Sequence, residues 1–307
     1  MASAAPASPR GSHVGAGVTL ARRAFRDARV RTISFASVFA IYAYVQPIGY
    51  RHAYPTAADR LGFAHGFGQN KALRLFYGEP RDLLSVNGYV AWRVGGTLAI
   101  AAAAFGLLAA VRALRAEEDA GRTELVLAGG AGRGQALLAS LVAIAAGTAA
   151  LWVAELAGFL LGGMPVPGSA YLALAGVSVV PVCVGIGALA SQIAPSRRSA
   201  LELGGGVVAL AFLLRVIADT SAGAGWLRWA TPLGWAEEMR PFGGARPLVL
   251  LLPLTASALL LAAAARIGRG RDIGAGLLAP RDSASADLRL LSSPMALALR
   301  GERGNLL

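Results

Sequence analysis

Six long runs with almost no charged side chains constrain this chain more than any other feature. They are Ile33–Gly49, Tyr89–Val111, Gln135–Leu161, Tyr171–Ile193, Leu203–Ala218 and Pro247–Ala265. A helix needs about 20 apolar residues to cross the hydrocarbon of a bilayer. Only 15% of the 307 residues are charged, against roughly 25% in a typical soluble domain. The sequence therefore predicts an all-α membrane protein, a bundle of six transmembrane helices, and it disfavours a soluble enzyme.

The basic residues fall unequally on the two sides of such a bundle. Alternate segments, starting with the N-terminal one, contain 19 Lys and Arg residues, and the segments between them contain 8. Basic loops are retained in the cytoplasm, so we expect a multi-pass protein of a bacterial plasma membrane with both termini cytoplasmic. Because the arginines lie beside apolar runs, the net charge of +12 indicates a lipid bilayer and not nucleic acid as the partner.

The runs also define the expected domains. Residues 1–32 should form a cytoplasmic tail with a basic amphipathic helix, 33–265 the six-span membrane domain, and 266–307 a basic cytoplasmic tail. The loop Asp219–Arg246 contains three tryptophans within ten residues, a composition that favours the headgroup boundary. We expect a short interfacial or re-entrant helix there, on the outer side.

An acidic loop follows the second run, on the side of the membrane that is otherwise rich in arginine. On a helix Glu117 would share a face with Gly121, and Glu118 with Arg122, while Leu125 and its neighbours would provide an apolar footing. One interpretation is an amphipathic helix that docks a soluble partner through its carboxylates. The alternative is a solvated loop with local ion pairs.

Three charged residues lie inside the runs, where charge is costly and often functional: Arg93, Glu155 and Arg215. Arg93 lies four residues after Tyr89 and Arg215 four before Asp219, so we expect both side chains to extend toward the outer headgroups. Glu155 is the best candidate for a carboxylate that binds a proton or a cation. In the same part of the chain, Gly158 and Gly162 should permit close helix approach, and Pro181 should kink the fourth span.

Other chemistries find little support. His13, His52 and His65 lack the spacing of a helical metal pair, and the single cysteine, Cys183, lies in an apolar run as a core thiol. There is no P-loop, so the chain should not bind ATP itself, and we expect no cofactor and no metal in it.

Several separate motifs carry a family resemblance. They are RAEEDAGRTELVLA at 115–128, YPTAA at 54–58, Trp92–Arg93, TPLGW at 231–235, RPF at 240–242 and RDIGAGLL at 271–278. In this order the chain resembles the permeases of ABC exporters for polyketide antibiotics, the tetronasin-resistance type, over nearly its whole length. The resemblance implies a permease that exports a hydrophobic compound, with no enzymatic activity of its own.

It also implies roles for particular residues. The acidic loop resembles a coupling helix that inserts into an ABC ATPase subunit, which would hold the ATP and Mg; its residues are Glu117, Glu118, Asp119, Gly121, Arg122 and Glu124. The segment before the sixth span would form an outer gate, with Trp229, Pro232, Gly234, Trp235, Glu238 and Arg240.

The chain departs from the family in length. Typical members have twelve spans in two halves, whereas this chain has six, and residues 293–303 resemble the basic helix that opens a second half. As a six-helix half it would need a second half, as a homodimer or a companion permease. The alternatives are an orphaned or truncated half-permease, and a membrane-embedded lipid-modifying enzyme that uses Glu155 or the loop with His52 and His65.

Overall fold

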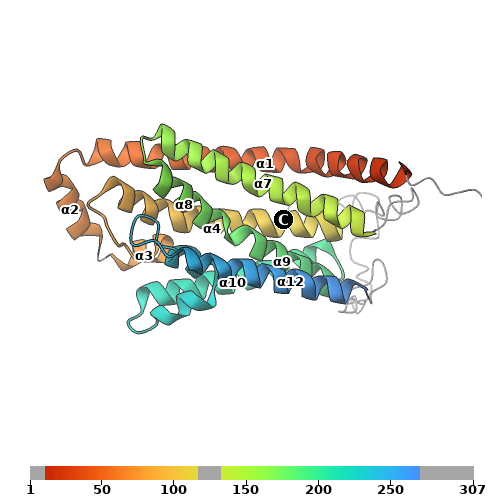
Figure 1. Cartoon of the computed structure of the whole chain (residues 1–307). Helices are drawn as coiled ribbons and strands as arrows, with labels where there is room; N and C mark the ends of the chain where they lie inside the picture. Colours follow the sequence, from red (N-terminus) through yellow and green to blue (C-terminus); the bar gives the residue numbers. More distant parts are fainter. Residues whose placement is uncertain (1–10, 69, 117–132, 270–307) are drawn as a thin grey trace, which may run out of the picture. The chain divides into compact units, whose positions relative to one another are not determined.

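The computed structural model describes residues 11–68, 70–116 and 133–269, and within these residues all regular structure is helical (Figure 1). Six segments are long and apolar enough to span a bilayer. They are α1 (Gly11–Ala53), α4 (Val86–Val111), α7 (Arg133–Leu161), α8 (Val166–Val177) with α9 (Val179–Ile193), α10 (Arg197–Thr220), and η3 (Pro247–Leu250) with α12 (Leu251–Arg269). The prediction of an all-α, six-helix membrane protein is confirmed.

Two spans begin at least six residues before their apolar runs do. The helix α1 is continuous from Gly11 and passes through residue 32 without a break, because residues 20–32 contain neither glycine nor proline. The helix α10 begins at Arg197, because the side chain of Ser196 accepts a hydrogen bond from the backbone N–H of Ser199 at 3.2 Å and caps the first turn. Charged residues thus extend both helices beyond their apolar runs.

The fourth span is interrupted at Ser178, between α8 and α9. Proline lacks an N–H group, so Pro181 cannot donate to the carbonyl of Val177, four residues earlier. The interruption lies one turn before the proline, and the predicted kink stays a prediction.

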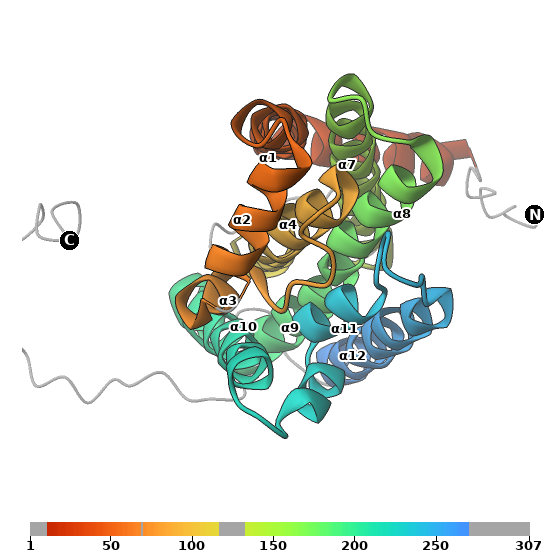
Figure 2. The ribbon, with the colours of Figure 1, turned by 90° about the vertical axis from the view of Figure 1, so that its left-hand side faces the viewer.

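Two spans are buried among the other four. In the most apolar windows, 67% of the residues are buried in α4 and 83% in α8–α9, against 17 to 28% in the remaining four. Seen along the bundle, α4 and α9 lie between α1 and α7 on one side and α10 and α12 on the other (Figure 2). Aromatic and leucine side chains from α1, α4 and α7 fill the largest core cluster, among them Phe39, Leu98, Phe105, Leu151 and Phe159. The outer four helices expose large apolar side chains, as lipid-facing helices do.

The helices α1 and α7 pack closely because α7 presents glycine to α1. A Cβ atom on Gly158 would lie 2.4 Å from the backbone oxygen of Ala40, and one on Gly162 would lie 2.5 Å from Cγ of Pro47. The predicted role of this glycine pair is confirmed.

Four short helices gather at the end of the bundle where α7 turns into α8 (Figure 1): α2 (Ala57–Phe67), α3 (Lys71–Tyr77), η2 (Gly225–Ala230) and α11 (Pro232–Glu238). We call this the capped end. The helix expected near the tryptophans is thus present, as η2 and α11. At the opposite end, η1 (Arg112–Ala116) is a π-helical turn. The predicted coupling residues, 117–124, lie outside the described residues.

Candidate functional site

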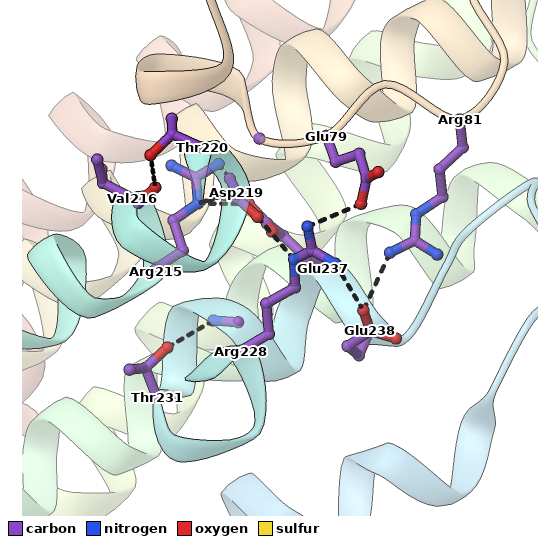
Figure 3. Close-up of polar contacts among 12 residues, drawn as sticks. Glu79, Arg81, Arg215, Val216, Asp219, Thr220, Arg228, Thr231, Glu237 and Glu238 are labelled. Atoms are coloured by element: carbon purple, nitrogen blue, oxygen red, sulfur yellow. Dashed lines mark hydrogen bonds and ion pairs between the residues drawn. The ribbon is translucent and has the colours of Figure 1, made fainter. Parts of the chain in front are cut away.

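The capped end contains a network of ion pairs centred on Arg215 of α10 (Figure 3). Its side chain is 1% exposed, and its Nε lies 2.9 Å from Oδ2 of Asp219, one turn further along the helix. Its guanidinium also pairs with Glu237 of α11 and donates to the backbone oxygen of Phe76 in α3 at 3.3 Å. The expectation that Arg215 extends to the headgroups is wrong, because buried carboxylates on two helices offer it stronger partners than the lipid surface would.

A second arginine extends the network to the loop after α3. The Nε atom of Arg228, in η2, donates to Oδ1 of Asp219 at 2.6 Å, and its Nη2 lies 2.7 Å from Oε2 of Glu79. Burial opposes the charge of Arg228, but the hydrogen bond to Asp219 and the charges of Asp219, Glu79 and Glu237 together raise the arginine's pKa above its usual value. Asp219 therefore bridges two arginines.

Glu238 of α11 accepts from several arginines at once. Arg81 lies 3.1 Å from Oε1, while Arg240 and Arg246 lie 2.8 Å and 3.0 Å from Oε2. Burial would raise the pKa of Glu238, but Arg81 and Arg240 hold it below its usual value. This carboxylate ties the loop before α4 to the segment that follows α11.

The neighbouring Glu237 is less readily ionised. Burial raises its pKa to about 7, although the guanidinium of Arg215 works in the opposite direction. Two adjacent carboxylates thus have opposite shifts, because Glu238 faces several arginines and Glu237 shares Arg215 with Asp219.

Glycines make these contacts possible at two places. Gly78 has a φ of +83°, and a Cβ atom there would lie 2.6 Å from Oε1 of Glu237 and 2.7 Å from Nη2 of Arg215. Gly234 lies against η2, where a Cβ atom would be 2.1 Å from the backbone oxygen of Arg228. Any larger residue would force α3 or α11 away from the network.

The other predicted gate residues shape α11 and its surface. Pro232 occupies the first turn of α11, where its missing N–H costs nothing. Trp235 donates through Nε1 to the backbone oxygen of Trp229 at 2.6 Å, and the Trp229 side chain is 45% exposed. The sequence thus identified the helix α11, which carries part of the network. The gate role of these residues stays a prediction.

A cavity lies beside the network, between α4, α8 and α11. Aromatic rings and glycines line much of it, including Tyr77, Trp92, Phe242, Gly95 and Gly176. Four charged residues also line it: Glu79, Arg81, Glu237 and Arg240. The site therefore combines apolar, aromatic and ionic surface, which suits an amphiphilic molecule better than a purely polar one.

Two residues beside this cavity have an unusual backbone. Arg240 has a φ of 52° and Phe242 a φ of 61°, a conformation that costs about 1–3 kcal/mol for residues with side chains. The ring of Phe242 lies against Gly168 of α8, where a Cβ atom would be 2.0 Å from it. The segment is held in this shape by the Glu238 ion pairs and by the hydrogen bond from the Tyr171 hydroxyl to the backbone oxygen of Met239, at 3.0 Å.

The remaining two intramembrane charges lie outside the network. The guanidinium carbon of Arg93 lies 4.0 Å from the centre of the Tyr77 ring, so this arginine stacks on α3. Glu155 of α7 has a fully buried side chain in the core. Among the described residues no group of three or more His, Cys, Asp or Glu could hold a metal ion.

Sequence reasoning did not identify six residues of the network: Glu79, Arg81, Asp219, Arg228, Glu237 and Arg246. One signal was present, since Asp219 follows Arg215 by four residues and shares its helical face. The other pairings join segments far apart in sequence, and no local pattern reports them.

Comparisons with known proteins are consistent with a membrane transporter. Residues 62–268 match the family model described as multidrug efflux system permease Rv1217c, C-terminal domain. Over 310 aligned residues the chain is 34% identical to the multidrug efflux system permease protein Rv1217c of Mycobacterium tuberculosis. The alignment covers 99% of this chain and 56% of that protein, so the chain spans about half the length of this relative.

Proposed function

Because the chain belongs to the family of multidrug efflux system permeases, which are transporters and not enzymes, we propose that it is a transmembrane permease subunit of an ATP-driven ABC exporter. The observation that carries this proposal is the family match over residues 62–268. The substrate would be a hydrophobic or amphiphilic compound, and the motif resemblance favours a polyketide antibiotic.

The energy would come from a separate ATPase subunit that binds ATP and Mg. The acidic loop with Glu117 and Glu118 would insert into that subunit and transmit its closure to the bundle. Support for this comes from the charge of the loop and from its position after α4, one of the two central spans. Because α4 lies at the centre of the bundle, a force applied at the loop after α4 would act directly on the bundle.

The capped end would be the outer gate. Its ion pairs connect α10, α11, η2 and the loop before α4 beside the cavity. Opening of the gate would therefore require these ion pairs to break or to change partners. This assignment places both termini in the cytoplasm, as the arginine distribution indicates. Six spans would form one half of the pathway, completed by a second copy or by a companion permease.

Co-purification tests the proposal. The tagged chain would be purified in mild detergent from its native membrane, as the wild type and as the double variant E117Q/E118Q. We expect a P-loop ATPase to accompany the wild type, and its recovery and ATPase activity to fall about tenfold or more in the variant, because rim charges fix the docking register.

The control is Glu202→Gln, which removes an exposed carboxylate on α10 (side chain 64% exposed) and should leave recovery unchanged. Equal recovery with the double variant would exclude the coupling role. A wild-type chain that brings down no ATPase would contradict the exporter proposal and favour an orphaned half-permease.

A further inference from the structure

Glu155 has a buried carboxyl group that makes no hydrogen bond within the described structure. Its side chain is fully buried, and neither Oε1 nor Oε2 has a hydrogen-bond partner. It lies on the core face of α7 between Leu151 and Phe159, both of which are also fully buried. An unpaired ionised carboxylate is costly in such surroundings, so the neutral acid fits this arrangement.

Among the described residues, no side chain donates a hydrogen bond to Glu155. The described part of α8 contains no charged residue. On α1, Arg51 donates to the backbone oxygens of Gly162 and Gly163, which lie just after the end of α7, seven and eight residues beyond Glu155. Arg31 of α1 stacks on Phe105, at the level of Gly147, about 12 Å along α7 from Glu155 at 1.5 Å per residue. Glu155 is therefore a buried carboxyl group that no described arginine of α1 neutralises.

One glycine contacts both this carboxylate and the cavity at the capped end. Gly176 of α8 lines the cavity. A Cβ atom at Gly176 would lie 3.4 Å from Oε2 and 3.6 Å from Oε1 of Glu155. Glu155 is therefore within van der Waals contact of a residue that lines the cavity.

The cavity itself suits a cation with aromatic groups. Trp92 and Phe242 line it, and aromatic faces attract positive charge. Tyr77 also lines it, with Arg93 already stacked on its ring. Lipophilic cations bring their own apolar surface into the membrane domain and need one anion to balance their charge, which Glu155 can supply. A glutamate within a span is costly, and such residues often mark substrate or ion pathways.

We infer that Glu155 is the counter-ion site for positively charged, lipophilic substrates that reach it from the cavity past Gly176. On binding, the carboxyl group releases its proton to solvent and the substrate cation takes its place. The inference rests on the proposed function, whose substrate class it specifies.

The test is direct binding of tetraphenylphosphonium to the purified chain in lipid nanodiscs, without any ATPase. Glu155→Gln keeps the size of the neutral acid and removes its capacity for charge, so it should fold normally. We expect its affinity for the cation to fall at least about thirtyfold, the loss typical when one member of a buried charge pair is removed. Binding of the anion tetraphenylborate, a probe of the same shape, should not weaken.

Two further variants sharpen the result. Gly176→Ala places a methyl group in ordinary contact with the carboxylate oxygens, and it should weaken cation binding while leaving thermal stability near that of the wild type. Glu202→Gln should bind the cation as the wild type does. Wild-type affinity in Glu155→Gln, or absence of tetraphenylphosphonium binding to the wild type, would overturn the inference.

The two proposals fail separately. Glu155→Gln should still co-purify with the ATPase, since the acidic loop is intact. Unchanged cation binding together with normal ATPase recovery would reject the counter-ion site and leave the exporter proposal standing. If no ATPase co-purifies with the wild-type chain, the exporter proposal is rejected, whatever the binding result.

Discussion

Arg215 is the residue on which the capped end most depends. Its guanidinium contacts α3 through the backbone oxygen of Phe76, α10 through Asp219 and α11 through Glu237. Removing one partner of a buried ion pair lowers stability far more than replacing the whole pair with apolar residues, because the remaining charge stays buried and uncompensated.

We therefore expect Arg215→Ala to lower the free energy of unfolding by about 3 kcal/mol. The reason is that Glu237 loses its cation and Asp219 keeps only Arg228. Unfolding of the purified protein by heat in detergent would measure the loss. The control, Arg198→Ala, removes a side chain that is 90% exposed and should cost less than about 0.5 kcal/mol. Similar losses in both variants would contradict the central role of Arg215.

The contacts of Arg215 also show what can be read from a sequence at this scale. The pairing with Asp219 follows from a four-residue spacing on one helix. Glu237 lies on another helix, and only the fold brings it beside Arg215. The distance of an arginine from the end of a span indicates whether its side chain can reach the headgroups, and says nothing of a competing buried carboxylate.

At the scale of elements, the parallel pair α1 and α7 is held by backbone approach. Apolar side chains gain little free energy by leaving lipid for another helix, so close van der Waals contact has to supply the attraction. Gly158 and Gly162 provide that contact. Glu155 lies on the same helix as these glycines, with its side chain buried in the core.

Gly158→Val should separate α1 from α7, because its side chain would meet the backbone of Ala40. We expect a loss of about 2 kcal/mol in the free energy of unfolding, the range found for overpacked cores. Gly206→Val is the matched control, since a Cβ atom at Gly206 has nothing within 4 Å and the helix-propensity change is the same. If both variants unfold at the same temperature, the contact contributes nothing to stability.

Element positions were more predictable than element ends. The six apolar runs all became spans, since hydropathy over 16 or more residues is a strong signal. Their ends depended on single residues, such as Ser196 capping α10 and Pro181 interrupting the fourth span. The tryptophan-rich loop was predicted to be helical from composition, but not its division into η2 and α11, where Thr231 separates the two by capping α11.

On the scale of the whole molecule, the arrangement of the spans could not be read from the sequence. Mean hydropathy in the best windows is 2.3 for α8–α9 and also 2.3 for η3–α12, although 83% of the first and 22% of the second are buried. Lipid and protein interior are both apolar, so composition does not distinguish a central helix from a peripheral one. The number of spans follows from the apolar runs, and the expected sidedness from the basic residues between them; both are visible in the sequence.

Sidedness gives the last prediction. If both termini are cytoplasmic, the capped end faces outward, and Ser221→Cys there should react with a membrane-impermeant maleimide in intact cells. Arg198→Cys, at the other end of α10, should react only after permeabilisation. Both positions are exposed, and the native Cys183 is buried and should not interfere. The reverse labelling pattern would invert the bundle, and it would then place the acidic loop out of reach of a cytoplasmic ATPase, which removes the basis for ATP-driven coupling through Glu117 and Glu118.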